Sequence, residues 1–189
     1  MRTTLTIAAL GLALMQLQGC VPLVATGIGA GALIAADRRS SGTYIEDQEI
    51  ALRTSNRIDA AYPDNTHVNV TSFNRNVLIT GEVPTAEARQ KIADIAKGVG
   101  NVRTVYNETV VGPVSPLSSR SNDTYITTKV KTRFLDAKRF QANYVKVVTE
   151  NGVVYLMGLV QPQEAEDAAQ IASTTSGVSK VVKIFEIVK

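Results

Sequence analysis

Hydrophobic residues in the second half of the chain follow first a helical and then a strand period. Ile126, Val130 and Phe134 recur every fourth residue, which places them on one face of an amphipathic helix. Asn122 or Asp123 can cap this helix. The elements predicted from there on are a helix over 122–139, a strand over 145–149, a hairpin turn at Asn151-Gly152, a strand over 153–160, a helix that Pro162 opens and Gly177 ends, and a strand over 181–187.

The first half of the chain repeats this order of elements. Its predicted elements are a helix over 48–61 stopped by Pro63, strands over 67–72 and 77–82, a helix over 84–97 and a strand over 102–110. Val68-Asn69-Val70 matches Val145-Lys146-Val147 at a spacing of 77 residues. We predict an α+β fold of two tandem αββαβ domains, each a three-stranded sheet with two helices on one face. Because each core of about 65 residues is small, contact between the copies is expected to add stability.

The chain begins with a segment typical of export. A single positive charge, Arg2, precedes an apolar run over 5–17, which matches the first two regions of a signal peptide. The run is shorter than the roughly 20 residues that span a bilayer as a helix. Leu17-Gln18-Gly19-Cys20 resembles a lipobox, in which the cysteine thiol takes a lipid. The alternative is that Cys20, the only cysteine, is an ordinary small hydrophobic residue.

The lipobox resemblance implies a signal peptide over 1–19 and a diacylglycerol and an N-acyl chain on Cys20. No other cofactor is expected. Val21 replaces the aspartate that retains lipoproteins at the inner membrane, which implies the periplasmic face of the outer membrane. We interpret 21–36, rich in glycine and alanine, as a tether near the membrane, and polar 37–43 as a flexible linker.

The repeated halves resemble the BON domain. The resemblance rests on the αββαβ order, on a glycine in the second strand (Gly81, Gly158), and on Gly-Val after the second helix (Gly98-Val99, Gly177-Val178). Caps and close packing explain the same glycines without a family. Two such domains behind a lipobox resemble the dual-BON outer-membrane lipoproteins of Gram-negative bacteria, which implies a role in envelope integrity and at the division site. The expected parts are the signal peptide 1–19, lipidated tether 20–45, first BON domain 46–112, linker 113–120 and second BON domain 121–189.

The residues give little support for catalysis or for a metal site. His67 is the only histidine and lies at the start of a predicted strand, so the sequence shows no spaced ligand set around it. Glu164 and Glu166 lie at a helix start, where they complement the helix dipole. We therefore predict no catalytic residues, no metal and no enzyme.

Charge separates the two repeats. Residues 47–111 hold seven Lys or Arg against eight Asp or Glu, whereas residues 120–189 hold ten against seven. The excess lies in the helix over 122–139, with five basic residues against Asp123 and Asp136. The basic residues on its polar face could serve only to keep the helix solvated, or they could contact anionic phosphates, and the residues favour both explanations equally.

The family resemblance favours the second explanation, because it implies that the first helix of the second domain binds anionic phospholipid such as phosphatidylglycerol. The site residues expected on this basis are Tyr125, Thr128, Lys129, Lys131, Thr132, Arg133, Leu135 and Asp136. The alternative function is a protein-interaction scaffold that serves outer-membrane protein assembly or the division machinery. Although the sequence pI is about 9.0, export and the lack of a recognised motif argue against nucleic acid. A monomer is expected.

Overall fold

A computed structural model describes residues 37–64 and 66–188. The predicted signal peptide, Cys20 and the tether up to residue 36 lie outside the described residues. A compact unit begins at Ala36 and includes both repeats. Within the described part of the chain, no helix combines the length and the apolar character needed to cross a membrane.

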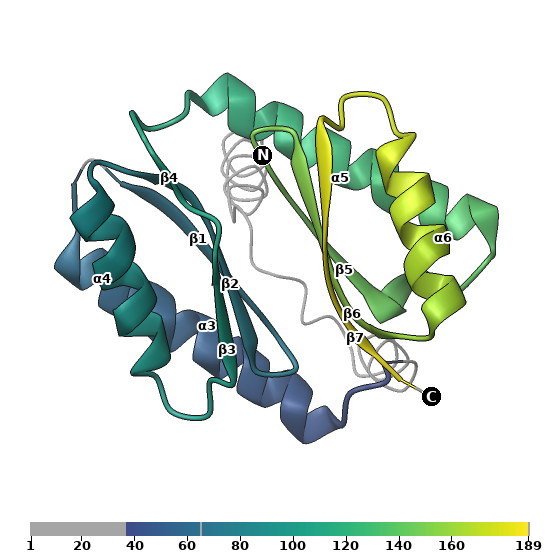
Figure 1. The fold of residues 1–189 in the computed structure, drawn as a ribbon, viewed down its shortest axis with the longest axis horizontal. Helices are drawn as coiled ribbons and strands as arrows, with labels where there is room; N and C mark the ends of the chain where they lie inside the picture. The colour runs from purple at the N-terminus through teal and green to yellow at the C-terminus, as the bar shows by residue number, and fades with distance from the viewer. Residues whose placement is uncertain (1–36, 65, 189) are drawn as a thin grey trace, which may run out of the picture. The chain divides into compact units, whose positions relative to one another are not determined.

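Each repeat has the predicted order of helices and strands (Figure 1). The first consists of α3 (Ser41–Ala61), β1 (His67–Phe73), β2 (Asn76–Val83), α4 (Ala86–Lys97), β3 (Thr104–Asn107) and β4 (Val110–Val111). The second consists of α5 (Leu117–Ala137), a short 3-10 helix (Ala142–Tyr144), β5 (Val145–Glu150), β6 (Val153–Val160), α6 (Pro162–Ser173) and β7 (Lys180–Ile187). Since β3 and β4 both pair with β2, they are two parts of one broken edge strand.

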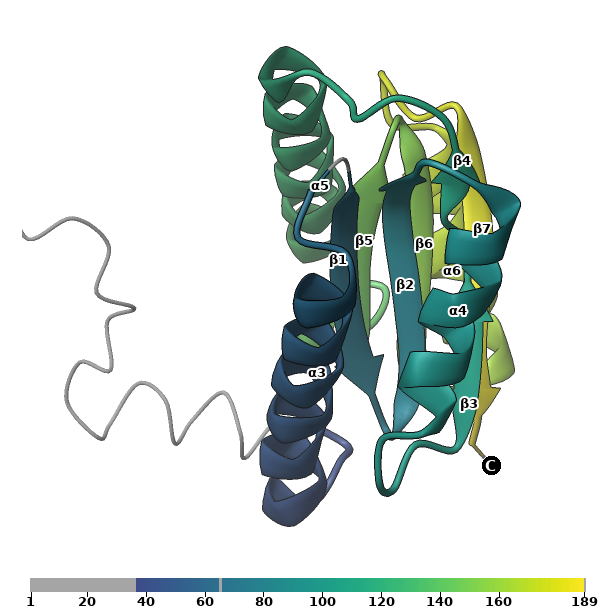
Figure 2. The ribbon, with the colours of Figure 1, turned by 90° about the vertical axis from the view of Figure 1, so that its left-hand side faces the viewer.

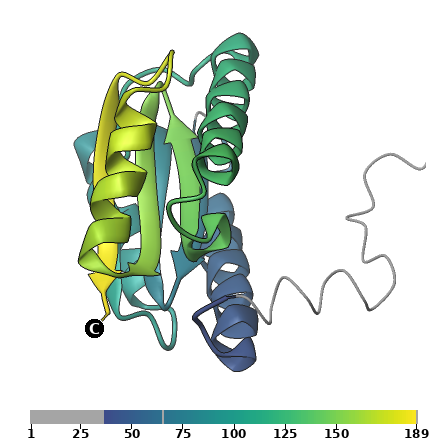
Figure 3. The same ribbon diagram turned by 90° about the vertical axis from the view of Figure 1, so that its right-hand side faces the viewer.

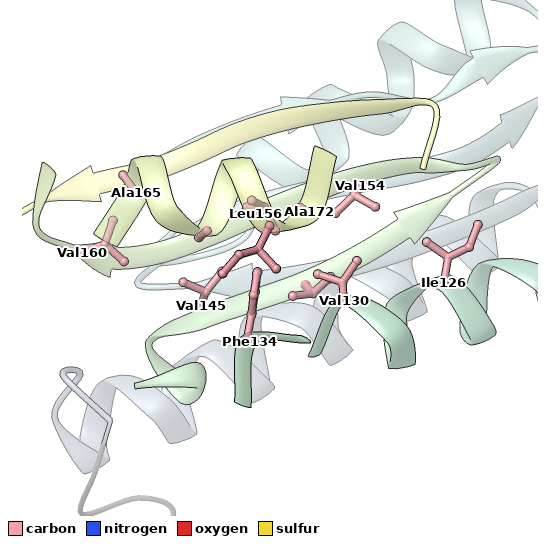
Figure 4. Packing of buried hydrophobic residues seen from close by; sticks show 12 residues of the cluster. Ile126, Val130, Phe134, Val145, Val154, Leu156, Val160, Ala165 and Ala172 are labelled. Atoms are coloured by element: carbon pink, nitrogen blue, oxygen red, sulfur yellow. The ribbon is translucent and has the colours of Figure 1, made fainter. Parts of the chain in front are cut away.

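Both sheets combine an antiparallel hairpin with a parallel third strand. β1 pairs antiparallel with β2, and β5 with β6, while β3, β4 and β7 join their sheets in parallel. In the second repeat, Ile126, Val130 and Phe134 are fully buried against β5, β6 and α6, as the helical period predicts (Figure 4). Each sheet therefore has its own apolar core under two helices, which confirms the predicted fold class.

The helix-free faces of the two sheets pack against each other (Figure 1). Along β2, Val77 and Ile79 point into the core of the first repeat, whereas Leu78 joins a second cluster. That cluster contains Tyr155 and Met157 from β6, so it spans both repeats. Burial raises the pKa of Tyr155 to about 12, so this phenol stays neutral between the sheets. The predicted contact between the copies is present.

A buried aspartate in the first helix of each repeat caps the hairpin of the same repeat. Asp47 accepts hydrogen bonds from the backbone N–H groups of Asn74 (2.7 Å) and Arg75 (2.8 Å). Asp123 likewise accepts from the backbone N–H groups of Asn151 and Gly152 at 2.9 and 2.8 Å. Both hairpins need this support because their two turn residues have positive φ. The prediction that Asn122 or Asp123 caps the helix was wrong, because α5 begins at Leu117 and both residues lie inside it.

The predicted flexible linker over 37–43 is largely fixed to the two repeats. Ser40 caps α3, which begins at Ser41 and not near residue 48. Arg38 binds Glu164 through two hydrogen bonds of 2.6 and 2.9 Å, and Arg39 donates to Asp47 at 2.7 Å. Glu164 lies 126 residues beyond Arg38, so local composition gives no sign of this partner.

Three further element bounds differ from the prediction. α5 begins at Leu117, within the segment predicted as a linker. α6 ends at Ser173, before Gly177, whose φ of 96° instead serves the loop to β7. The strand predicted over 102–110 is interrupted at Glu108 and Thr109. Thr109 is buried there and bonds to the side chain of Asn107, a local contact that replaces strand pairing.

The ion pair between Arg38 and Glu164 leads to a prediction about acid stability. The hydrogen bond from Arg38 holds the pKa of the Glu164 carboxyl below its ordinary value of 4.5. A carboxyl whose pKa is lowered by folding stabilises the fold above that value and loses this effect as pH falls. We expect Glu164→Gln to reduce the free energy of unfolding by about 1 kcal/mol at neutral pH. The difference from the natural chain should shrink in urea titrations below pH 4.5. A difference that is constant with pH would contradict the role of this ion pair.

Candidate phospholipid-binding surface

α5 carries exposed apolar side chains on the face opposite the core. Tyr125 is 61% exposed and Leu135 is 64% exposed, although both belong to a helix whose opposite face is fully buried. Asp123, Ile126 and the rest of the buried face hold the helix against β5. The outward face is therefore rigidly presented, as the sequence predicts for Tyr125 and Leu135.

A groove lies between α5 and the segment that follows α6. Figure 3 shows the two helices covering the second sheet together. The α5–α6 groove has a volume of about 490 Å³ and is lined by Tyr125, Thr128, Lys129, Thr132, Arg133 and residues 174–176. Six of these eight residues carry a hydroxyl group and two carry a positive charge. The hydroxyl groups of Thr128, Thr174 and Thr175 already donate to backbone carbonyl oxygens. The two cations are therefore the main groups of this lining that can bind phosphate oxygens.

Lys129 and Arg133 are fixed beside this groove by neutral partners. The Lys129 ammonium donates to the carbonyl oxygen of Ser176 and lies 4.6 Å from the ring centroid of Tyr125. The Arg133 guanidinium donates to the Ile171 carbonyl oxygen at 2.9 Å and to the Thr175 hydroxyl at 2.7 Å. Because these acceptors carry no charge, none of them offsets the positive charges beside the groove.

The structure does not bring all the predicted site residues together. Lys131 lines a separate cavity between α5 and β1, and Leu135 lines another groove beside Arg139. Asp136 is exposed and lines neither. Thr174, Thr175 and Ser176 were missed by sequence reasoning, because they belong to the loop after α6 and not to the charged helix. The run of hydroxyl residues over 173–176 was the available signal.

A second polar cluster lies where the two repeats meet. His67, Glu82 and Glu150 each place one potential ligand atom within 4.8 Å of the others. Both glutamates are buried, and the His67 Nε2 atom lies 3.9 Å from the Glu150 Oε1 atom. The sequence shows no ligand set around His67 because these neighbours come from another strand and from the other repeat.

The comparison with known families assigns both repeats. A model described as the BON domain matches residues 46–113 and again residues 122–189. The chain belongs to the BON-domain family. It is 40% identical over 172 residues to the outer membrane lipoprotein DolP of Haemophilus influenzae, covering 90% of this chain and 89% of that protein. The prediction of a dual-BON lipoprotein is confirmed.

Two further BON-domain relatives cover most of the chain. A 21 kDa hemolysin of Actinobacillus pleuropneumoniae is 35% identical over 155 residues, covering 81% of this chain and 80% of that protein. The osmotically-inducible protein Y of Escherichia coli is 27% identical over 160 residues, covering 82% of this chain and 80% of that protein. Membership of this group makes the chain a non-enzymatic outer-membrane lipoprotein of the cell envelope. The predictions that it is not an enzyme and lies at the outer membrane are confirmed by this membership.

Proposed function

We propose that this BON-domain lipoprotein binds anionic phospholipid, such as phosphatidylglycerol, through the outward face of α5 and the α5–α6 groove. The observation that carries the proposal is the combination of exposed Tyr125 with two fixed cations in one hydroxyl-lined groove. Tyrosine is favoured at membrane interfaces because its ring is apolar and its hydroxyl is polar. Insertion of this ring places the groove at the level of the lipid phosphates.

The charges of α5 favour an anionic surface over a neutral one. A basic side chain near such a surface contributes about 1 kcal/mol. Lys129 and Arg133 are held at the groove, and Lys131 lies on the adjacent side of the same helix. In the first repeat, α3 exposes Leu52 to the same extent as Tyr125, but its surface has three acidic residues against two arginines and so no excess of positive charge. We therefore assign lipid binding to the second repeat.

The proposed binding face acts together with the predicted lipid anchor on Cys20. An acylated cysteine keeps the chain at the membrane, so that contact between α5 and lipid becomes an intramolecular event at high effective concentration. The anchor holds the protein at the periplasmic face of the outer membrane. The second repeat then selects regions of membrane that are rich in anionic lipid. Enrichment at the division site and support of envelope integrity are the proposed consequences.

Co-sedimentation with vesicles tests lipid binding when the acyl chains are absent. The full chain carrying Cys20→Ser is expected to bind vesicles containing phosphatidylglycerol and to bind phosphatidylcholine vesicles weakly. Tyr125→Glu should weaken binding at least tenfold, because it replaces an interfacial ring with a negative charge. Lys129→Gln should weaken it about fivefold, the effect of about 1 kcal/mol.

Leu52→Glu is the matched control, since Leu52 and Tyr125 are both 61% exposed on the first helix of their repeats. It should leave binding unchanged. Equal binding to both kinds of vesicle, or an equal loss with Leu52→Glu, would overturn the proposal.

A protein-interaction scaffold is the second candidate function, and one feature of the first repeat favours it. Val110 and Val111 in β4 are 52% and 53% exposed, next to Val114 at 37%. These residues form an apolar strip at the edge of the first sheet, where an assembly or division protein could bind. An intact chain that fails to bind either kind of vesicle would favour this candidate.

A further inference from the structure

The cluster of His67, Glu82 and Glu150 is built by the fold from both repeats. His67 begins β1 and lies opposite Glu82 in the β1–β2 register. Glu150 ends β5, in the other sheet. The face-to-face packing of the sheets therefore brings together one imidazole and two carboxylates that are remote in sequence.

Two carboxylates are buried here without a lysine or arginine partner. Glu82 is 3% exposed and Glu150 is 6% exposed. In the range covered by residues 37–64 and 66–188, no Lys or Arg forms a salt bridge with either one. Buried charges are costly unless they are paired or bind a metal ion. This cluster therefore has an excess of negative charge that a cation would balance.

Neutral groups hold the two carboxylates in place. Thr80 and Asn69 donate to Glu150 Oε2, each at 2.9 Å, and the Asn69 amide nitrogen also lies 3.2 Å from His67 Nε2. Asn151 donates to Glu82 Oε1 at 2.6 Å. Such surrounding hydrogen bonds orient metal ligands in proteins.

Ser115 gives a second, independent observation beside this cluster. Its backbone N–H donates to Glu82 Oε2 at 3.2 Å, so the residue borders the cluster. Its hydroxyl oxygen is buried and has no hydrogen-bond partner, the one such side-chain atom among the described residues. Buried polar atoms without a partner are rare and often mark a bound water or ion.

The equivalent positions of the repeats show that packing does not require this cluster. At the 77-residue spacing of the strands, His67 corresponds to Tyr144 and Glu82 to Leu159. Glu150 corresponds in the same way to Phe73. Phe73 and Leu159 belong to the apolar cluster between the sheets. The equivalent positions of the two carboxylates are thus filled by apolar side chains of the interface.

We propose that His67, Glu82 and Glu150 bind a divalent transition-metal ion of the Zn²⁺ type, which links the two repeats. One imidazole nitrogen with two carboxylate oxygens suits zinc better than calcium or magnesium, which prefer oxygen alone. Ligands at zinc distances lie roughly 3.4 Å apart in a tetrahedron. His67 Nε2 and Glu150 Oε1, at 3.9 Å, need only a small side-chain shift. Water completes the coordination.

A cavity gives the ion a route to this site. It has a volume of about 580 Å³ and is lined by His67, Glu150 and the side of α5 that carries Arg120. The Arg120 guanidinium donates to the Ser115 carbonyl oxygen at 2.8 Å and leaves both carboxylates unpaired. The metal site is therefore reachable from solvent while its ligands are mostly buried.

Zinc binding by the full chain carrying Cys20→Ser, first stripped with EDTA, tests the proposal without lipid. Isothermal titration is expected to give one Zn²⁺ per chain at micromolar affinity or tighter. Zn²⁺ should raise the melting temperature, because an ion that binds only the folded state stabilises it. His67→Asn and Glu150→Gln should each weaken binding at least about tenfold. Co²⁺ should show the visible bands of a low-coordinate nitrogen and oxygen site, and these bands should disappear in both variants.

Glu186→Gln is the matched control. Glu186 lies at the same interface, where it accepts hydrogen bonds from Asn74, Asn76 and Arg103, but it is not part of the cluster. It should keep the natural zinc affinity. The absence of stoichiometric binding, or an equal loss in Glu186→Gln and Glu150→Gln, would overturn the metal site. Because no vesicles are present, this result leaves the lipid proposal untouched.

Discussion

Gly81→Ala is expected to lower the free energy of unfolding by at least about 3 kcal/mol. Gly81 has a φ of 110°, a conformation that residues with a side chain rarely adopt. An added Cβ would lie 1.9 Å from the His67 carbonyl oxygen. Since that oxygen belongs to the paired strand β1, it cannot move aside without breaking the hairpin. Urea unfolding followed by circular dichroism measures the loss.

Two other glycines serve as controls for Gly81→Ala. An added Cβ at Gly112 meets no atom within 4 Å, so Gly112→Ala should be neutral. At Gly158, the equivalent residue in β6, a Cβ would lie 2.5 Å from the Tyr144 carbonyl oxygen, but φ is not positive. Gly158→Ala should therefore be intermediate. The same unfolding midpoint for Gly81→Ala and Gly112→Ala would show that β1 and β2 are not this close.

Asp47→Ala is expected to cost about 3–5 kcal/mol, because it removes one partner of a buried ion pair. The Asp47 carboxylate accepts hydrogen bonds from Arg39, the Ser72 hydroxyl and two hairpin N–H groups. Its side chain has no exposed surface, and that of Arg39 is only 7% exposed. The substitution leaves a buried guanidinium with Asp37 alone and removes the support of a turn with two non-glycine residues at positive φ.

Asp123→Ala provides the comparison inside the same chain. Asp123 accepts from two hairpin N–H groups of the second repeat, and no basic side chain among the described residues binds it. Asp123→Ala should lower the free energy of unfolding by about 1–3 kcal/mol, because it leaves two buried N–H donors without an acceptor. Equal losses of stability for the two variants in urea titrations would show that the Arg39 pair adds nothing.

The sequence predicts the elements and cores well because those depend on local periodicity. Ile126, Val130 and Phe134 are fully buried, as their spacing requires. The turn at Asn151-Gly152 has positive φ at both residues, as that pair favours. Exposure of Tyr125 also follows from the helical period, since a residue next to a buried position lies on another face.

Features that depend on contacts between the repeats are hidden from local patterns. The composition around Arg38 predicts a flexible linker, yet its partner Glu164 lies 126 residues further along the chain. His67 has no ligand-type residue at a recognisable spacing, because Glu82 and Glu150 reach it through strand pairing and sheet packing. In the candidate lipid site, the sequence of α5 shows its charges but not the oxygen atoms of α6 and its following loop that hold them.

The positions of Arg38 and Arg39 have a mechanical consequence for a protein held at a membrane. Arg38 donates hydrogen bonds to Glu164 of α6 and to the Leu159 carbonyl oxygen in the second repeat. Arg39 donates to Asp47 in the first repeat. Tension that arrives from the amino-terminal side of the chain is therefore divided between the two domains before it reaches α3. A pulling force is therefore borne by both repeats through the two arginines. It does not act on α3 alone, so it does not separate this helix from its sheet.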